Sequence, residues 1–473
     1  MPPTLDELMR ALPEVEPAEA ESLGKPLAAA SLWPVPVGRW RRLRLLGTLQ
    51  AKIGAAYLFY WIRGWFKNVE HRERLLAETH WRTAVSLLDS MSYLRGAVMK
   101  IGQTLANFPD IVPRAVVETL EQLHYDAPPL HWSLLREMVH HELGDDPENV
   151  FASFDKQAFA AASLGQVHRA RLKTGEEVAV KIQYPGIART IREDFRNFFL
   201  LLLPGRLNKD WQSTKDQFDD LRARLERETD YSVEAAVQEK VRALFREDDG
   251  IVVPRVYPRY STSRVLTMDY LDGVHIDEFL ARTPSQEERN EFARKIVRAW
   301  ARILYAGRLS YADMHPGNFL FLPDGRLGVI DFGFMVAHTD DEWRDLHKVD
   351  RAMTTGRRED LIAAIKEWGY LTDSPEDADR LRLHEAFAEW CWLTHSRGRS
   401  FDFGDEADFR RGIDLFLEMI RKRYSRARPC TPAIARMNFG VRALLYRLKA
   451  NIDPRPISEE EVKATGWDRS DYA

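Results

Sequence analysis

Two short stretches, Asp313-Met314-His315-Pro316-Gly317-Asn318 and Asp331-Phe332-Gly333, decide the fold, with thirteen positions from Asn318 to Asp331. An acid followed five positions later by an amide lets one loop present a carboxylate to a hydroxyl or a water molecule while the amide oxygen binds Mg²⁺. A second acid completes the metal site, because hard cations prefer oxygen ligands. We therefore expect Asp313 to position a nucleophile, and Asn318 and Asp331 to bind the metal.

The sequence before Asp331 predicts how this acid is positioned. The apolar run Leu327 to Ile330 is typical of a short strand, and Asp324-Gly325 before it favours a hairpin turn. A second Asp-Phe-Gly occurs at residues 402–404, but it follows polar sequence and no comparable loop precedes it. We interpret that copy as part of a loop or a cap, because the tripeptide alone is a weak signal.

Upstream, Lys181 ends the alternating run Val178-Ala179-Val180-Lys181, which is typical of a half-buried strand. Such a strand would hold the ammonium above the α and β phosphates of a nucleotide. A lysine at a strand end is usually a solvated surface group, so this interpretation depends on the acids downstream. A carboxylate must orient the lysine, and an acid-rich helix with Glu226, Glu228 and Asp230 follows it. We expect Glu228 to be the partner.

An alanine-rich loop precedes the lysine strand, where a glycine-rich loop would cover the phosphates of a bound nucleotide. Its sequence is Ala160-Ala161-Ala162-Ser163-Leu164-Gly165-Gln166-Val167. Alanine disfavours positive φ, so we expect this loop to be stiffer and to present fewer backbone amides than one built of glycine. The same letters occur at Ala28-Ala29-Ala30-Ser31-Leu32, so low complexity is the alternative interpretation, and only the context separates the two copies.

Composition bounds the class of protein. A chain of 473 residues is too long for one core, so we expect a two-lobed body with an extension. The net charge of −4, from 68 basic and 72 acidic residues, gives no global field that would attract a nucleic acid. The two cysteines, Cys391 and Cys430, lack metal-ligand spacing and are too few for a disulfide framework, so we interpret them as structural and expect a reducing compartment.

The N-terminal sequence predicts neither secretion nor a membrane span. Residues 1–20 are acidic and contain proline, unlike a signal peptide, so we expect a cytoplasmic protein. The stretch Leu45 to Trp65 is interrupted by polar residues and cannot supply about 18 apolar residues in a row. Cations at residues 39–44 make it a candidate for peripheral membrane contact, with a helix packed on the body as the alternative. A second basic group at 421–428 offers at most contact with an anionic surface.

Farther upstream, Lys100-Ile101-Gly102-Gln103 closes an apolar helical pattern, and residue types alone favour a solvated helix end. The order of all these motifs, however, resembles the UbiB (AarF-like) family of atypical kinases. The family's signatures look like KxGQ at Lys100 to Gln103, AAAS at Ala160 to Ser163, and ExD at Glu228-Thr229-Asp230. The resemblance covers about residues 80 to 450, and the combination is highly specific although each motif alone is not.

The resemblance implies an α+β, bilobal protein-kinase-like fold with a helical N-terminal extension packed over the nucleotide cleft. We expect a flexible tail at 1–39, the extension at 40–145, an N-lobe at 146–272 and a helical C-lobe at 273–473. Within them the pattern predicts a helix around 212–246, strands at 251–256 and 264–269, and mainly helices from residue 286. Lys100 and Gln103 would lie over the cleft, with Asp230 pairing Lys100 while Glu228 serves Lys181, although the two acids could be exchanged.

The resemblance further implies ATP and Mg²⁺ as cofactors, ATPase activity, and a role in ubiquinone (isoprenoid quinone) biosynthesis or lipid homeostasis. The acceptor of the phosphoryl group is either water or a hydroxyl on a lipid-like or quinone-precursor molecule. An ordinary protein kinase is disfavoured, because no APE motif follows Phe334. A nucleotide-responsive scaffold without useful turnover is the alternative from another class, and the sequence leaves the oligomeric state open.

Overall fold

The computed structural model of the protein describes residues 132–162, 164–185, 187–188, 191, 222, 226–371, 374–391, 399–422, 424, 428 and 430–466. The chain divides into two compact units: Met1–His141, Asp155–His168 and Ile182–Thr229 make up one, and Glu142–Phe154, Arg169–Lys181 and Asp230–Ala473 the other. The tail predicted at 1–39, and nearly all of the extension predicted at 40–145, lie outside the described residues.

The β-rich part of the chain follows two short helices, α7 (Trp132–Leu143) and α8 (Pro147–Val150). Four strands pair in the order β1 (Ser153–Phe154), β3 (Gly165–Arg171), β4 (Glu177–Gln183) and β6 (Val265–Asp269), and β2 (Ala160–Ala162) pairs with β3. Strand β4 confirms the strand predicted at Val178 to Lys181. Residues 178–183 of this strand are buried on both faces, not on one, because Lys181 and its acid partners occupy the second face.

Short strands carry the Asp313–Asn318 and Asp331–Gly333 motifs. The hairpin of β8 (Phe319–Phe321) and β9 (Leu327–Val329) is confirmed, with Gly325 at φ 83° in its turn. Strand β5 (Ile251–Val252) pairs in parallel with β9 and is shorter than the strand predicted at 251–256, whereas β6 matches the run predicted at 264–269. Strands β7 (Leu309–Tyr311) and β10 (Met335–Ala337) are antiparallel and flank both motif loops.

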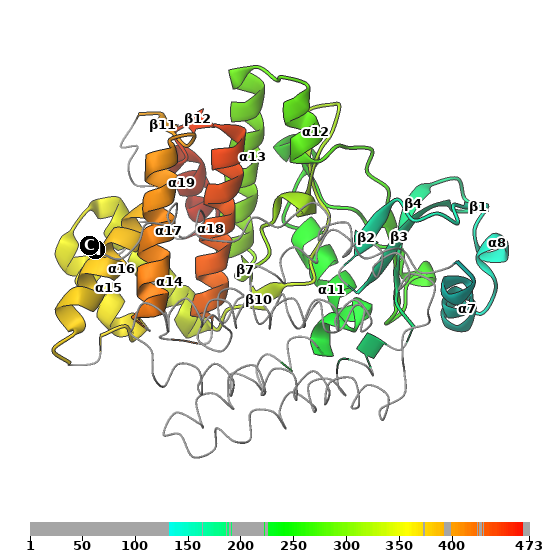
Figure 1. Cartoon of the computed structure of the whole chain (residues 1–473), viewed down its shortest axis with the longest axis horizontal. Helices are drawn as coiled ribbons and strands as arrows, with labels where there is room; N and C mark the ends of the chain where they lie inside the picture. The colour runs from blue at the N-terminus through cyan, green and yellow to red at the C-terminus, as the bar shows by residue number, and fades with distance from the viewer. Residues whose placement is uncertain are drawn as a thin grey trace, which may run out of the picture. The chain divides into compact units, whose positions relative to one another are not determined.

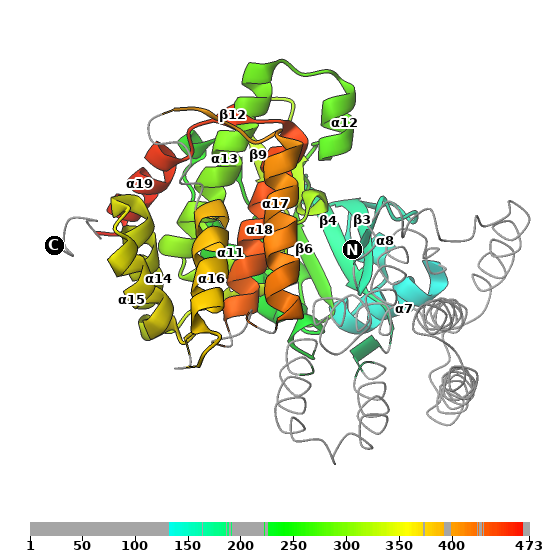
Figure 2. The ribbon, with the colours of Figure 1, turned by 60° about the vertical axis from the view of Figure 1, so that its left-hand side comes forward.

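The remaining helices build most of the larger unit. Helix α13 (Gln286–Tyr305) packs against α18 (Thr431–Leu448) and α19 (Arg455–Ala464), and its second half is almost fully buried. Figure 1 shows α13, α17 (Glu406–Arg421) and α18 side by side. The prediction of mainly helical sequence from residue 286 is confirmed, with short strands between the helices. The other elements, several of them visible in Figure 2, are α11 (Tyr231–Arg242), α12 (Ile276–Ala281), α14 (Asp340–Thr355), α15 (Arg358–Trp368), α16 (Asp377–Cys391), β11 (Phe401–Asp402), α17 (Glu406–Arg421) and β12 (Asn451–Ile452).

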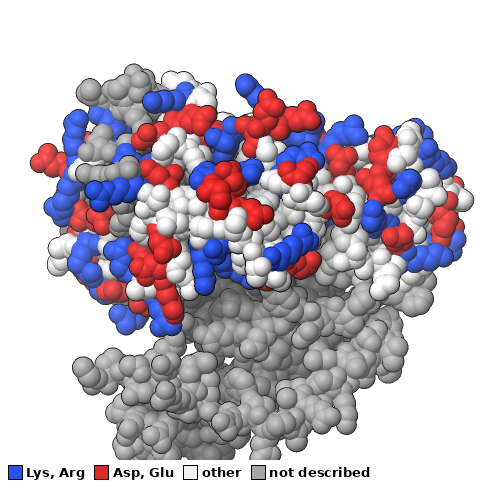
Figure 3. All heavy atoms as spheres, turned by 90° about the horizontal axis from the view of Figure 1, so that it is seen from above, with Lys and Arg blue, Asp and Glu red and all other residues white. Residues whose placement is uncertain are grey.

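Charges on the described surface are balanced locally. Basic and acidic side chains intermingle on the face seen in Figure 3, as 68 basic and 72 acidic residues would predict. Within the basic group at 421–428, Lys422 pairs with Asp379 and Glu418, and Arg428 pairs with Asp345. Among the described residues, none of the helices combines the length and the apolar character that crossing a membrane requires.

Candidate functional site

A buried lysine between two acids forms the centre of the candidate site. The Nζ atom of Lys181 donates to both carboxylate oxygens of Glu234, at 2.7 and 3.0 Å, and to Oδ2 of Asp331 at 3.3 Å. The side chains of Lys181 and Glu234 are each 6% exposed, whereas that of Asp331 is 30% exposed. The lysine and the first acid are therefore enclosed, and the second acid faces solvent or a ligand.

The local sequence explains why these groups meet. Strand β4 is pinned by apolar neighbours, so the position of Lys181 is fixed by packing. Helix α11 begins after Asp230, whose Oδ1 accepts from the backbone N of Ser232 as an N-cap. The ring of Tyr231, one residue later, lies 5.0 Å from the Lys181 ammonium, a favourable cation–π distance. Glu234 follows in the first turn of the helix and points to the lysine.

The electrostatics of the site keep Lys181 charged. Burial alone would lower the pKa of Lys181, but the charges of Asp331 and Glu234 outweigh it and hold the pKa well above its usual value. Burial raises the pKa of Glu234, against the opposing effect of Lys181. The site therefore holds a permanent cation whose position is set by two carboxylates, an arrangement suited to binding phosphate oxygens.

The prediction that Glu228 orients Lys181 is wrong, because Glu234 occupies that place. Glu228 lies before α11, in a helical turn that ends at Thr229, and Asp230 caps α11. The sequence did carry a signal for Glu234: this residue is the one acid in the run Tyr231 to Gln238, where small and apolar neighbours predict burial. An acid buried without an evident partner needs a cation nearby.

The loop that carries Asp313 is closed on itself. The amide Nδ2 of Asn318 donates to the backbone O of Asp313 at 2.8 Å and lies 3.3 Å from its Oδ2. Because this bond fixes the amide nitrogen on the Asp313 side, the amide oxygen is the atom left for a cation. Asn318 and Asp331 together supply hard oxygen donors, so the residues fit Mg²⁺.

Tyr311 connects the two motifs, and no sequence motif predicted its role. Its buried hydroxyl donates to the backbone O of Asp331 at 2.6 Å. Burial, with the charges of Asp331 and Asp313, raises the pKa of Tyr311 well above its usual value, so the hydroxyl keeps its proton and remains a donor. The signal available was its place two residues before Asp313, at the end of a short buried strand.

Helix α18 supports the Asp313 loop from a distant part of the sequence. Nη2 of Arg436 lies 3.7 Å from Oδ1 of Asp313. One turn later, a Cβ added to Gly440 would lie 2.7 Å from the backbone O of Met314. A side chain at position 440 would therefore push against the loop.

We expect Gly440→Ala to lower the urea midpoint of unfolding. Helix propensity alone would stabilise the variant by about 1 kcal/mol, whereas forcing a methyl group against the Met314 backbone costs about 1–3 kcal/mol. Gly440→Ala should therefore destabilise the protein, whereas the same substitution at an unhindered helix position would stabilise it. Equilibrium urea unfolding followed by circular dichroism measures this midpoint. A raised midpoint would show that the loop moves aside without losing stability.

The alanine-rich loop forms a hairpin in which Ala160, Ala161 and Ala162 pair with Val167, Gln166 and Gly165, respectively. A Cβ on Gly165 would lie 2.1 Å from the backbone O of Ile182, so glycine is required here by packing against β4. Leu164 is buried and its backbone O accepts from the N of Tyr184. Ser163, Lys100 and Gln103 lie outside the described residues, and their predicted contacts with a nucleotide stay predictions.

The second Asp-Phe-Gly has the same local turn and different surroundings. Oδ1 of Asp402 accepts from the N of Gly404 at 2.8 Å, as Oδ1 of Asp331 accepts from the N of Gly333 at 2.9 Å. Asp402 ends the two-residue strand β11, where a loop or cap was predicted. The tripeptide alone therefore specifies only a turn. The copy at Asp331 differs from the copy at Asp402 because it lies beside Lys181 and Glu234.

Taken together, the lysine–glutamate pair, the Asp313 loop and the Asp331 turn, set among mixed helices and sheets, define a kinase-like α+β domain. The model of the ABC1 atypical kinase-like domain matches residues 122–363. The chain belongs to this family, the UbiB (ABC1, AarF-like) atypical kinases, as the sequence predicted.

The names of similar proteins support this family assignment. The AarF domain-containing kinase 1 of Drosophila melanogaster is 30% identical over 64% of this chain, and this chain spans only 60% of that protein's length. The mitochondrial atypical kinase COQ8 of Saccharomyces cerevisiae is 29% identical over 79% of this chain and 74% of its own length. Among solved structures, the Rv3197–erythromycin complex from Mycobacterium tuberculosis is similar with a TM-score of 0.56 at 26% identity, covering 84% of this chain and 100% of Rv3197.

Proposed function

We propose that the protein binds ATP with Mg²⁺ and transfers the γ-phosphoryl group, as an ATPase or as a small-molecule kinase, in lipid or ubiquinone biosynthesis or homeostasis. The observation that carries this proposal is the buried ammonium of Lys181 held between Glu234 and Asp331. A lysine held in this way has a fixed place and a permanent charge, as contact with the α and β phosphates requires. The name of the yeast relative, an atypical kinase, supports the same activity.

Each motif has a role in this proposal. Asn318 and Asp331 would hold Mg²⁺, which when bound neutralises charge on the phosphates. Asp313 would orient the nucleophile, and the Ala160 to Val167 loop would cover the nucleotide. Because Glu234 serves Lys181, Glu228 and Asp230 both remain proposed partners for Lys100 in the KxGQ motif.

The acceptor of the phosphoryl group is water or the hydroxyl of a lipid-like or quinone-precursor molecule. Positioning and charge stabilisation provide most of the catalysis in phosphoryl transfer, so the same residues serve both acceptors. A protein acceptor is disfavoured, because β10 and α14 follow Gly333 closely and α14 already begins at Asp340. The remaining alternative is a nucleotide-responsive scaffold, for which nucleotide binding would stabilise the fold without turnover.

We propose a cytoplasmic location with peripheral contact at a membrane surface, where an apolar acceptor would be found. Of the basic group at 421–428, Lys422 and Arg428 are already paired with acids, which weakens their attraction to anionic lipid. The stretch 45–65 is therefore the better candidate for this contact.

The proposal predicts that Glu234→Gln lowers Mg²⁺-dependent ATP hydrolysis about 100-fold, because a displaced Lys181 no longer meets the phosphates. The measurement is phosphate release by purified protein, with and without anionic liposomes that carry a quinone-precursor phenol. Stimulation together with phosphorylation of the phenol would identify a small-molecule kinase, and hydrolysis alone an ATPase.

The matched control is Glu239→Gln on the same helix, because Glu239 pairs with Arg242 and with the backbone N of Val256, away from Lys181. We expect this variant to keep wild-type turnover. Equal, Mg²⁺-independent rates in wild type and both variants, together with thermal stabilisation by ATP, would instead favour the scaffold.

A further inference from the structure

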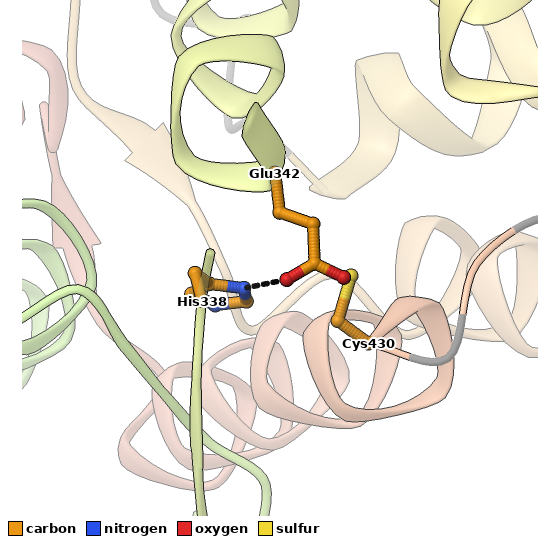
Figure 4. Close-up of side chains that lie close together, drawn as sticks. All are labelled: His338, Glu342 and Cys430. Atoms are coloured by element: carbon orange, nitrogen blue, oxygen red, sulfur yellow. Dashed lines mark ion pairs between the residues drawn. The ribbon is translucent and has the colours of Figure 1, made fainter. Parts of the chain in front are cut away.

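Three chemically different ligand groups meet outside the candidate phosphoryl-transfer site. His338 directly follows β10, Glu342 lies in the first turn of α14, and Cys430 precedes α18. One ligand atom of each side chain lies within 4.8 Å of the other two. Figure 4 shows the carboxylate of Glu342 lying between the imidazole of His338 and the thiol of Cys430.

The imidazole of His338 makes no hydrogen bond on the side that faces the other two groups. Its side chain is 0% exposed, and Nδ1 is a buried polar atom without a hydrogen bond. Nδ1 lies 4.0 Å from Oε2 of Glu342, along the dashed line in Figure 4 and beyond hydrogen-bond distance. A buried polar atom left in this state costs about 1–3 kcal/mol, so a native fold needs a reason to keep it.

Neighbouring groups already orient two of the three side chains. Nε2 of His338 lies 2.7 Å from Oγ of the buried Ser310, which fixes the ring plane and leaves Nδ1 directed at the cluster. Metal-binding histidines are commonly held through their second nitrogen in this way. Oε2 of Glu342 accepts from the backbone N of Thr339 at 3.0 Å, in the capping box of α14. The arrangement therefore exists before any ligand arrives.

We propose that His338, Glu342 and Cys430 bind a divalent cation of the zinc class. A nitrogen, an oxygen and a sulfur donor together suit Zn²⁺ and exclude the hard cations, which avoid thiolate. Ligand atoms around one tetrahedral zinc lie about 3.3–3.8 Å apart, given bonds of about 2.0–2.3 Å. The observed separations of up to 4.8 Å need a closure of about 1 Å, within the reach of side-chain rotation.

The fourth position would be taken by water on the Glu342 side. The Glu342 side chain is 16% exposed, whereas Cys430 is 3% exposed. Glu342 thus marks the route by which a cation enters. The sequence could not predict this site, because Cys430 lies far along the chain from His338 and no ligand spacing connects them. The earlier interpretation of Cys430 as merely structural is replaced by this proposal.

A bound cation would clamp the segment after the Asp331 turn to the start of α18. That segment consists of β10 and the first turn of α14, and α18 also carries Arg436 beside Asp313. The cation would therefore hold two parts of the larger unit together without touching a nucleotide. Its binding is measurable in the absence of ATP, so the test is independent of the proposed phosphoryl transfer.

The experiment is a titration of metal-free, reduced full-length protein with Co²⁺, which replaces zinc and absorbs light when a thiolate binds it. We expect one equivalent of Co²⁺ to give a near-ultraviolet sulfur-to-cobalt charge-transfer band, and one equivalent of Zn²⁺ to abolish it. The chain has only two cysteines, so Cys391→Ser is the matched control. The band should persist in Cys391→Ser and vanish in Cys430→Ser.

A second variant separates loss of a ligand from loss of the fold. Glu342→Gln keeps a side chain that can complete the capping box, so α14 should remain intact by circular dichroism. We expect this variant to bind Zn²⁺ at least about 100-fold more weakly, since loss of even an outer partner costs about 10–100-fold. A wild type without the band, a band that survives Cys430→Ser, or a Glu342→Gln variant with unchanged Zn²⁺ affinity would overturn the proposal.

Discussion

The Asp331→Asn variant is expected to lose Mg²⁺-dependent ATP turnover by about 1,000-fold, the scale seen when a main electrostatic contact of a reaction site is removed. The amide keeps the size of the side chain and can still accept the bond from the N of Gly333. The substitution removes the negative charge that we propose attracts Mg²⁺ and that lies 3.3 Å from Nζ of Lys181. Phosphate release at saturating Mg²⁺ and ATP measures the loss.

The second Asp-Phe-Gly provides the control for this variant. Asp402→Asn makes the same chemical change in a turn with the same internal hydrogen bond. Because Asp402 lies on β11, away from Lys181, we expect turnover within twofold of wild type. If both variants lost activity equally, the effect would come from the turn and not from the charge beside the lysine.

Lys181→Met is expected to destabilise the folded protein by about 3–5 kcal/mol, because removing one member of a buried ion pair strands the other charge. Glu234 would remain buried with Asp331 as its neighbour and without a cation. The measurement is urea unfolding at several pH values. Burial raises the pKa of Glu234 even beside Lys181, and removing the opposing charge of the lysine raises that pKa further, so the folded variant binds a proton there more readily than the unfolded chain. The loss of stability relative to wild type should therefore become smaller as pH falls and larger as pH rises through the pKa of Glu234.

Lys348→Met is the control, because Lys348 also contacts two acids, Asp345 and Glu367, but its side chain is 38% exposed. Exposed pairs contribute about 0–1 kcal/mol, so the change should be small and nearly independent of pH. A similar loss of stability in Lys181→Met and Lys348→Met would mean that burial does not determine the destabilisation at Lys181.

The sequence predicted the parts of the site that depend on short-range spacing. Asp313 and Asn318 lie in one loop, and Asp331 follows a hairpin whose turn residues are diagnostic, so local geometry determines their relation. The strand of Lys181 was also predictable from its alternation. Its full burial was not, because the covering face comes from residues some fifty positions later, as the 53-residue separation of Lys181 and Glu234 shows.

The partner of Lys181 could not be predicted reliably from the sequence. Glu228, Asp230 and Glu234 lie within one stretch, and choosing among them required the first residue of α11. A boundary two or three residues earlier would have turned a different acid toward β4. Tyr311 and Arg436 were missed for a related reason: both act on the motifs through contacts that depend on tertiary packing.

The dependence of the Asp313 loop on α18 has a consequence for biosynthesis. The backbone N of Tyr311 donates to Sδ of Met437, 126 residues later, and Gly440 lies against Met314. During synthesis on a ribosome the motif residues therefore emerge long before the helix that supports them. A nascent chain that ends before Thr431 would carry every motif and yet have no supported loop, so the proposed nucleotide turnover should begin only once α18 has been translated and has folded.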